Sequence, residues 1–436
     1  VLSVKWHFRA VHYPAAVGEY HQVMARLWFV SAPLLGHLDW GGFLRTAQVL
    51  QQMGHEVTWV SGSPVAGAIQ RAGIAFAPIR QTGWLWPPPP APDLSSIPPQ
   101  EAVMLRYRRA LDTWLTEDRV AEAVEALVEL AAQIGKPDLI ATDPFLTAAA
   151  LAAEVLAVPL VVGGWPAQAD LDAGRMYPVQ QSLGQESQAR LGRLQDRFRL
   201  EGINFSKGPT PSIISPRLHV SYFTQSWYQI ERDALLPQNA FVGGHPTPPQ
   251  DAPPDWLRAI PEDQPLALIT LGSVFTGDLG FFSWAAQAAA RLGLLSIVVL
   301  GWNPIEPEEK AKLIAALPGS TRLLNWVDFA HVLPRTRLII HHGGMGTTHA
   351  AVVHGLPQIV VPHAADQRGQ ARRVAQAKVG LNLSAHDVRN GALLEGSRAL
   401  LQDRQVLARA RQLAADMAAL GGPERAAHLI LEAGAN

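Results

Sequence analysis

The stretch that decides the fold of this chain is Leu338-Ile-Ile-His-His-Gly-Gly-Met-Gly-Thr-Thr-His349. An apolar strand, predicted at 337–341, runs into a glycine-rich turn, and a helix follows as far as His354. Glycines let the backbone approach a ligand closely, and the free N–H groups of a first helical turn favour a phosphate. On its own the Gly-Gly-x-Gly pattern is also typical of a tight packing turn or of a Rossmann dinucleotide loop.

Strands alternate with helices on both sides of this stretch. Upstream, short apolar runs predict strands at 26–31, 56–61, 74–79, 138–142 and 159–163. Downstream, strands are predicted at 266–271, 296–300, 321–325, 337–341 and 358–361, and the chain then ends in helices. Strand–helix–strand alternation at this spacing predicts parallel sheets with helices on their faces.

The two series are separated by His245-Pro-Thr-Pro-Pro-Gln-Asp-Ala-Pro-Pro254, which predicts a stiff, extended linker. We therefore predict an α/β protein with two Rossmann-like domains that face each other across a cleft. The expected divisions are an N-terminal extension (1–23), an N-terminal domain (24–244), the linker (245–257) and a C-terminal domain with its terminal helices (258–436).

Composition excludes several classes of protein. The formal net charge of the 436 residues is −1, which gives no electrostatic case for nucleic acid or an anionic membrane as partner. The chain has no cysteine, so disulfides, thiolate metal sites and cysteine nucleophiles are excluded. No apolar run reaches the ~20 residues of a membrane span. We expect a cytoplasmic location and at most weak peripheral contact with a membrane.

The surroundings of the glycine-rich turn complete a longer pattern. Asn325-Trp-Val-Asp328 precedes it, and Gly355-Leu-Pro-Gln-Ile-Val-Val-Pro362 followed by His363-Ala-Ala-Asp-Gln367 comes after it. Together these segments resemble the nucleotide-sugar signature of the GT-B glycosyltransferases of family 1, the sterol, antibiotic and plant secondary-product type. Weaker resemblance extends over nearly the whole chain from Met24, including Gly36-His37 and Leu271-Gly-Ser273.

The resemblance implies a donor site for a UDP- or TDP-linked sugar, which is a co-substrate and not a cofactor. Trp326 would stack on the nucleobase and Val327 would bond it through the backbone. The diphosphate would be held by His342, Ser273 and the turn formed by Gly343, Gly344, Gly346 and Thr347. Asp366 and Gln367 would hydrogen-bond the sugar hydroxyls, which suits a carboxylate beside an amide.

One position departs from the family pattern. Relatives commonly place a glutamate, which holds the ribose hydroxyls, where this chain has Ala350. The missing carboxylate weakens the case for a strict uridine donor and leaves room for a thymidine donor.

The resemblance also implies a catalytic base, His37, in the loop after the first strand. Asp143, in Ile140-Ala-Thr-Asp-Pro-Phe145, occupies the place of the aspartate that orients the base. Because parallel strands end at one edge of a sheet, these distant residues are expected to converge there. A carboxylate on one ring nitrogen raises the basicity of the other and fixes the tautomer. The loop itself departs from the family, with Leu38-Asp39-Trp40-Gly41 in place of a proline three residues after the histidine.

We expect metal-independent, inverting transfer of a hexose, with glucose favoured, to a hydroxyl of a largely apolar small molecule. No metal ligands are predicted, because the clustered histidines of 341–363 do not have convergent spacing. Two alternatives from other classes stay open: a catalytically silent helper with this fold, and a sugar-nucleotide epimerase. The acceptor is expected to contact aromatic side chains of the N-terminal domain, namely Trp84, Trp86, Tyr107, Trp114 and Trp165.

Overall fold

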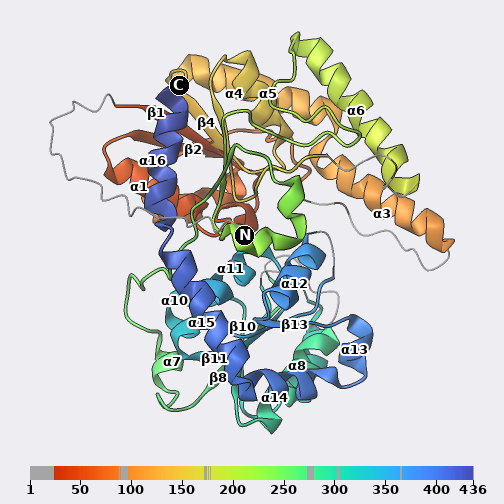
Figure 1. The fold of residues 1–436 in the computed structure, drawn as a ribbon, viewed down its shortest axis with the longest axis vertical. Coiled ribbons are helices and arrows are strands. Elements are labelled where there is room, and N and C mark those ends of the chain that lie inside the picture. Colours follow the sequence, from red (N-terminus) through yellow and green to blue (C-terminus); the bar gives the residue numbers. More distant parts are fainter. Residues whose placement is uncertain are drawn as a thin grey trace, which may run out of the picture.

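The computed structural model describes residues 24–87, 89, 97–170, 174, 176, 178–272, 279–301, 305–363 and 366–435. The predicted extension at 1–23 and Ser273 lie outside these residues. Two α/β halves are stacked along the long axis of the molecule, as Figure 1 shows. Each half is built around one parallel sheet, as the alternation of strands and helices predicts.

The N-terminal half contains a seven-stranded parallel sheet in the order β3-β2-β1-β4-β5-β6-β7. Its strands are β1 (Arg26–Val30), β2 (Glu56–Ser61), β3 (Ala75–Pro78), β4 (Leu139–Thr142), β5 (Leu160–Gly163), β6 (Leu218–Ser221) and β7 (Asn239–Phe241). Its helices are α1 (Phe43–Gln52), α2 (Ala66–Arg71), α3 (Pro99–Trp114), α4 (Glu117–Ile134), α5 (Thr147–Val155) and α6 (Pro178–Phe198). Its 3₁₀ segments include η1 (Leu35–His37), η2 (Ser63–Val65) and η4 (Gln225–Ala234).

The C-terminal half contains a six-stranded parallel sheet in the order β10-β9-β8-β11-β12-β13. Its strands are β8 (Leu266–Thr270), β9 (Leu295–Val299), β10 (Thr321–Leu324), β11 (Thr336–His341), β12 (Gln358–Val360) and β13 (Gly380–Asn382). Its helices are α7 (Asp255–Arg258), α8 (Leu279–Arg291), α9 (Pro307–Ala316), α10 (Phe329–Val332), α11 (Met345–Val353), α12 (Gln367–Gln376), α13 (Ala385–Arg389), α14 (Ala392–Gln402) and α15 (Arg404–Ala418). The short 3₁₀ turn η5 (Leu333–Arg335) joins α10 to β11.

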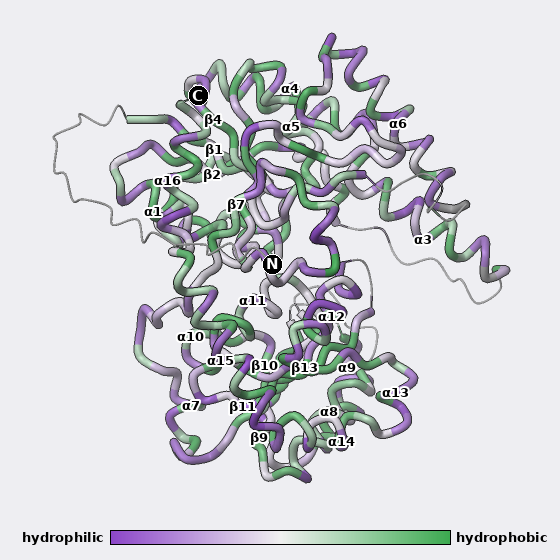
Figure 2. Tube along the Cα trace, viewed as in Figure 1, coloured by the Kyte–Doolittle hydropathy of each residue, from purple (hydrophilic) through white to green (hydrophobic). Residues whose placement is uncertain are grey.

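The central strands are apolar because helices cover both faces of each sheet. Every residue of β4, β5 and β8 is buried, as expected of a parallel sheet with no solvent-facing side. Figure 2 shows the hydrophobic residues concentrated along the strands, with hydrophilic stretches on the projecting helices α3 and α6. One core cluster crosses between the halves, since it joins Phe223 and Trp227 to Met345 and Val352.

The last helix, α16 (Gly422–Ala435), belongs by sequence to the C-terminal series but packs elsewhere. Its Ala426 and Ile430 are in the same buried cluster as Phe43 and Ala47 of α1, on the N-terminal half. Figure 1 shows it lying alongside α1. The chain therefore crosses between the halves twice, at the proline-rich linker and again before α16, which the predicted range 258–436 did not anticipate.

Three of the strands were not predicted from the sequence. β7 and β13 have only three residues each, and β6 is Leu-His-Val-Ser, whose polar members interrupt the apolar run. The polar side chains of β6 have hydrogen-bond partners. His219 Nε2 accepts from the Ser215 backbone, and the Ser221 hydroxyl bonds to Tyr228. His219 Nδ1 also lies 3.2 Å from the Trp165 carbonyl oxygen, 54 positions earlier in the chain, and this tertiary contact leaves no local signal in the sequence.

Candidate active site at the meeting of the two sheets

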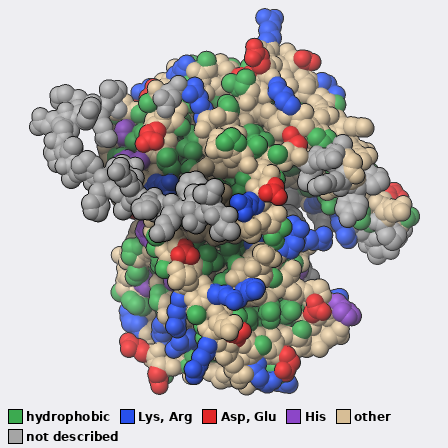
Figure 3. Space-filling model, viewed as in Figure 1, with side chains coloured by type: hydrophobic (Ala, Val, Ile, Leu, Met, Phe, Trp, Pro, Cys, Tyr) green, Lys and Arg blue, Asp and Glu red, His purple; other side chains and the backbone are tan. Residues whose placement is uncertain are grey.

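Each sheet has a point where the strand order reverses direction, and ligands of doubly wound sheets bind at such points. In the N-terminal sheet this point lies between β1 and β4, and in the C-terminal sheet between β8 and β11. His37 and Asp143 follow β1 and β4, while Gly272 and His342 follow β8 and β11. Figure 3 shows the molecular surface notched between the two halves. The predicted residues therefore come from the loops at both switch points.

His37 and Asp143 form a hydrogen-bonded pair. His37 Nδ1 lies 3.0 Å from Asp143 Oδ2, and the aspartate side chain is fully buried while 14% of the histidine side chain is exposed. The other carboxylate oxygen accepts from the Phe145 backbone N–H at 2.7 Å, which fixes its orientation. A carboxylate at Nδ1 holds the proton there and leaves Nε2 free to accept one. The pair has the geometry of an oriented general base.

Aromatic rings surround this histidine. The ring centroids of Trp40, Trp84 and Phe145 lie 4.8, 4.9 and 6.1 Å from that of His37. Trp165 lies behind them, against Trp40 and Phe145. Trp40 and Phe145 were not singled out from the sequence, although each stands two or three residues after a predicted catalytic residue. The departure from the family in the loop after His37 thus places an indole against the base.

The other aromatic residues expected at the acceptor site lie in different surroundings. Trp86 lines a cavity together with Trp84. Tyr107, on α3, is 45% exposed. Trp114, at the end of α3, packs against the buried cluster on the outer face of the N-terminal sheet. Their part in acceptor binding stays a prediction.

The glycine-rich turn holds two adjacent histidines in different environments. His341 is enclosed by protein, since its Nε2 contacts Gln358 at 3.1 Å and its Nδ1 accepts from the Gly343 N–H. His342 packs between Gly272 and Gly344, where an added Cβ would come within 2.7 and 2.4 Å of its ring. Nδ1 of His342 is buried without a hydrogen-bond partner in the described part of the chain.

Burial, reinforced by the neighbouring His341 and His363, lowers the pKa of His342 to about 3. The sequence left open whether a histidine here adds a charge or a hydrogen bond. With this pKa the ring is neutral at pH 7, so it offers a ligand a hydrogen bond and no charge. Within the residues that the structure describes, burial lowers the pKa of four buried histidines to about 3 or 4: His219, His341, His342 and His349.

The positive field at the turn comes from the start of α11. Its N-cap, Gly344, has no side chain to satisfy the first amides, and the first intrahelical bonds to Gly344 begin only at the Thr348 N–H. The earlier N–H groups have no acceptor within the helix, and this is the arrangement that binds anionic oxygens. Gly346 and Thr347, in this first turn, are exposed and half-buried.

The base loop of the N-terminal half touches this same helix. An added Cβ on Gly346 would lie 3.7 Å from the Asp39 carbonyl oxygen, and one on Gly41 would lie 2.7 Å from the His349 ring. Asp39 is half-buried with its Oδ1 atom enclosed, and desolvation raises its pKa although Arg45 and the first amides of α1 oppose the shift. The loop that carries His37 is therefore packed directly against the predicted diphosphate turn.

The predicted nucleobase platform lies at the far edge of the C-terminal sheet. Trp326 follows the edge strand β10 and is 62% exposed, so its ring is available for stacking. Val327 is buried, and Ala350 of α11 packs against the same apolar cluster. Three strand spacings, or about 14 Å, separate β10 from β11 in the sheet. An extended ligand would bridge the platform and the turn.

Asp366 and Gln367 stand at the start of α12. Burial raises the pKa of Asp366, while its electrostatic interactions with His37 and Arg373 oppose that shift. The interaction with His37 brings the predicted donor carboxylate within electrostatic range of the predicted base in the opposite half. Gln367 Oε1 accepts from the His363 backbone N–H at 2.8 Å, so this amide already has a protein partner.

An ion pair that the sequence analysis missed joins the halves beside these residues. Arg373 of α12 bonds Glu231 of η4 at 2.9 Å, and only 4% and 16% of the two side chains are exposed. The guanidinium also lies over the rings of Tyr228 and Trp165, at 4.8 and 5.9 Å. Removing one partner of such a buried pair leaves an uncompensated charge. No local motif marks either residue, because they are 142 positions apart.

One group of side chains in the described part of the chain has metal-ligand geometry: Asp251, Asp328 and His331. All three have roles within the protein. His331 Nε2 contacts Asp251 at 2.7 Å, and Asp328 accepts from the Ala330 N–H and so caps α10. The group therefore ties the linker to the segment after Trp326. Among the described helices, none combines the length and apolarity needed to cross a membrane.

Two parallel-sheet α/β domains whose switch-point loops meet form the architecture of the GT-B fold. Residues 304–432 match the family described as erythromycin biosynthesis protein CIII-like, C-terminal domain. The NDP-glycosyltransferase YjiC of Bacillus subtilis (strain 168) is 26% identical over 91% of this chain and 94% of its own length. The crystal structure of the glycotransferase of kitacinnamycin superposes with a TM-score of 0.72 at 22% identity, covering 94% of this chain and 99% of the other.

A further solved structure shares the fold and carries a nucleotide. The spinosyn rhamnosyltransferase SpnG, complexed with thymidine diphosphate, superposes with a TM-score of 0.64 at 22% identity, over 92% of this chain and 98% of its own. Together with the full-length curated relative, these findings confirm the family that the signature indicated. They support a family 1 GT-B glycosyltransferase.

Proposed function

We propose that this glycosyltransferase moves a hexose, preferably glucose, from a UDP- or TDP-linked donor to a hydroxyl of a largely apolar small molecule, with inversion at the anomeric carbon. The observation that carries the proposal is the His37–Asp143 pair, joined at 3.0 Å and packed within a loop that touches the first turn of α11. A base next to an anion-binding helix start supports attack on one side of the sugar and departure of diphosphate on the other.

In this mechanism His37 Nε2 removes the acceptor proton, and Asp143 stabilises the imidazolium that forms. The acceptor oxygen attacks the anomeric carbon from the face opposite the diphosphate. The free amides of α11 and the neutral His342 ring bond the leaving group as its charge develops. Asp366, which interacts electrostatically with His37, and Gln367 bond the sugar hydroxyls.

The nucleotide would lie across the sheet from Trp326 to Gly343, Gly344 and the start of α11. Ala350 offers no acceptor to a ribose hydroxyl, which supports acceptance of a thymidine donor beside uridine. The complex of SpnG with thymidine diphosphate agrees with this reading. Activity is expected to survive EDTA, because the leaving charge is bonded by helix amides.

The test is transfer from UDP-glucose and from TDP-glucose to a panel of hydroxylated aromatic compounds, followed by mass spectrometry. A product one hexosyl unit heavier is expected, with the anomeric configuration opposite to that of the donor by NMR. Retention of configuration would contradict the single displacement. Absence of both transfer and donor hydrolysis would contradict the proposed function, and epimerised nucleotide sugar would indicate the epimerase alternative.

A further inference from the structure

A cavity of about 670 Å³ opens beside the catalytic pair in the N-terminal half. It lies at the carboxyl ends of β1, β2 and β3, so it occupies the same sheet edge as His37 but on the opposite side of β1 from Asp143. Its volume is within the range of sites for drug-sized ligands. Trp84 joins the two places, since it lines the cavity and lies edge-on to the His37 ring at 4.9 Å.

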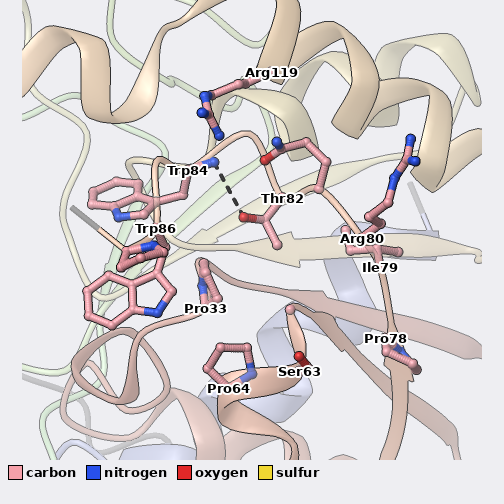
Figure 4. Close-up of a pocket in the computed structure, with 13 residues that line it drawn as sticks. Pro33, Ser63, Pro64, Pro78, Ile79, Arg80, Thr82, Trp84, Trp86 and Arg119 are labelled. Atoms are coloured by element: carbon pink, nitrogen blue, oxygen red, sulfur yellow. Dashed lines mark hydrogen bonds between the residues drawn. The ribbon is translucent and has the colours of Figure 1, made fainter. Parts of the chain in front are cut away.

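The walls of the cavity are flat and rigid. Figure 4 shows the indoles of Trp84 and Trp86 on one side, with the rings of Pro33 and Pro64 near them. The loop that carries the indoles is held by one internal hydrogen bond and by one to α3, since the Trp84 N–H donates to Thr82 Oγ1 and the Leu85 N–H to the Thr113 carbonyl. Fixed indole and proline faces favour a planar ring system, because they stack on it without losing side-chain freedom.

The charged side chains that line the cavity in the described part of the chain have one sign. Arg119 of α4 and Arg80 contribute to the lining, and none of its other described residues is Asp or Glu. Arg119 is half-buried, and neither arginine has an ion pair or hydrogen bond within the described residues. In Figure 4 the Arg119 guanidinium lies on the Trp84 side, whereas the exposed Arg80 side chain extends away. A half-buried guanidinium without a partner favours an anionic group, to which it can donate two parallel hydrogen bonds.

We propose that this cavity binds the aromatic part of the acceptor and that Arg119 selects acceptors bearing an anionic group, such as an aromatic hydroxy acid. This proposal rests on the proposed function, because the ligand is taken to be the acceptor of the sugar. It adds the chemical class of that acceptor and a residue that determines specificity. The hydroxyl of such a molecule faces His37 past Trp84, while its carboxylate pairs with Arg119.

The probes are 6-hydroxy-2-naphthoate and its neutral methyl ester, whose binding is measured by calorimetry at pH 7.5 without a donor. The wild-type protein is expected to bind the acid about tenfold more tightly, as one charge-assisted hydrogen bond implies. Arg119→Gln should remove the preference and Arg119→Lys should retain part of it. Arg80→Gln, at the exposed arginine of the same cavity, should leave it intact.

Equal binding of acid and ester by the wild type overturns the proposal, and so does an unchanged preference in Arg119→Gln. Loss of the preference in Arg80→Gln instead overturns the assignment to Arg119. Hexose transfer to the two probes is measured separately. Transfer to both with equal binding leaves the proposed function standing and refutes the anion selectivity. An acid preference in binding, with neither transfer nor donor hydrolysis over the whole acceptor panel, refutes the proposed function and supports the ligand class of the cavity.

Discussion

Replacing Asp143 by Asn tests the proposed base with the least change in shape. The Asn side-chain oxygen can still accept from the Phe145 N–H, so the loop after β4 should keep its conformation. The amide –NH₂, however, donates where the carboxylate accepted. His37 must then turn its unprotonated Nδ1 toward it, which leaves the proton on Nε2 and removes the acceptor needed by the substrate.

The size of the effect follows from the geometry. Opposite unit charges 3.0 Å apart attract by about 5.5 kcal/mol at an effective dielectric constant of about 20. The Asn –NH₂ that faces the ring cannot accept a hydrogen bond from it, so this attraction is lost without replacement. A loss of up to ~5.5 kcal/mol in stabilising the imidazolium corresponds to a fall in kcat of up to ~10⁴.

The assay is initial-rate transfer under donor saturation, with binding of the free nucleoside diphosphate measured by calorimetry. Asp138→Asn is the matched control. Asp138 precedes the first residue of β4, is exposed to solvent, and among the described residues accepts only from the Arg26 N–H. We expect Asp143→Asn to lose turnover and keep nucleotide binding, and Asp138→Asn to keep both. A kcat within threefold of wild type for Asp143→Asn would refute the role assigned to the pair.

Three further predictions concern packing, donor choice and pH. Gly41→Ala should lower the free energy of unfolding by at least ~1 kcal/mol more than Gly54→Ala. Both glycines have φ near +90°, but a Cβ meets another side chain, the His349 ring, only at Gly41. Equal losses on chemical denaturation would show that backbone strain alone acts. UDP-glucose and TDP-glucose should bind within about tenfold of each other, and Ala350→Glu should shift the preference toward UDP; a hundredfold uridine preference in the wild type would show that another residue holds the ribose. The four buried histidines have folded pKa values below the unfolded value of 6.5, so the unfolded state binds more protons. The free energy of unfolding therefore falls as the pH drops from about 6.5 toward 4, by up to ~1.4 kcal/mol per pH unit for each ring. Equal unfolding free energies at pH 7 and pH 5 would contradict their burial as neutral rings.

The sequence alone predicted the two parallel sheets and placed the candidate site residues at the carboxyl ends of their strands. Apolar runs such as 26–30 and 266–270 must be buried on both faces, and glycines at 343 and 344 permit the turn, so local pattern suffices for these features. The resemblance to the family paired His37 with Asp143, and the convergence of residues that end parallel strands is consistent with that pairing.

What only the tertiary structure decided involves contacts between residues distant in the chain. Three features leave no local signature in the sequence. They are the contacts of Trp40 and Phe145 with His37, the Arg373–Glu231 ion pair, and the packing of α16 on the N-terminal half. The neutrality of His342 likewise depends on burial between two glycine loops from different strands, which sets its solvation. Desolvation and long-range packing are properties of the folded arrangement, so they could not be predicted from the order of residues.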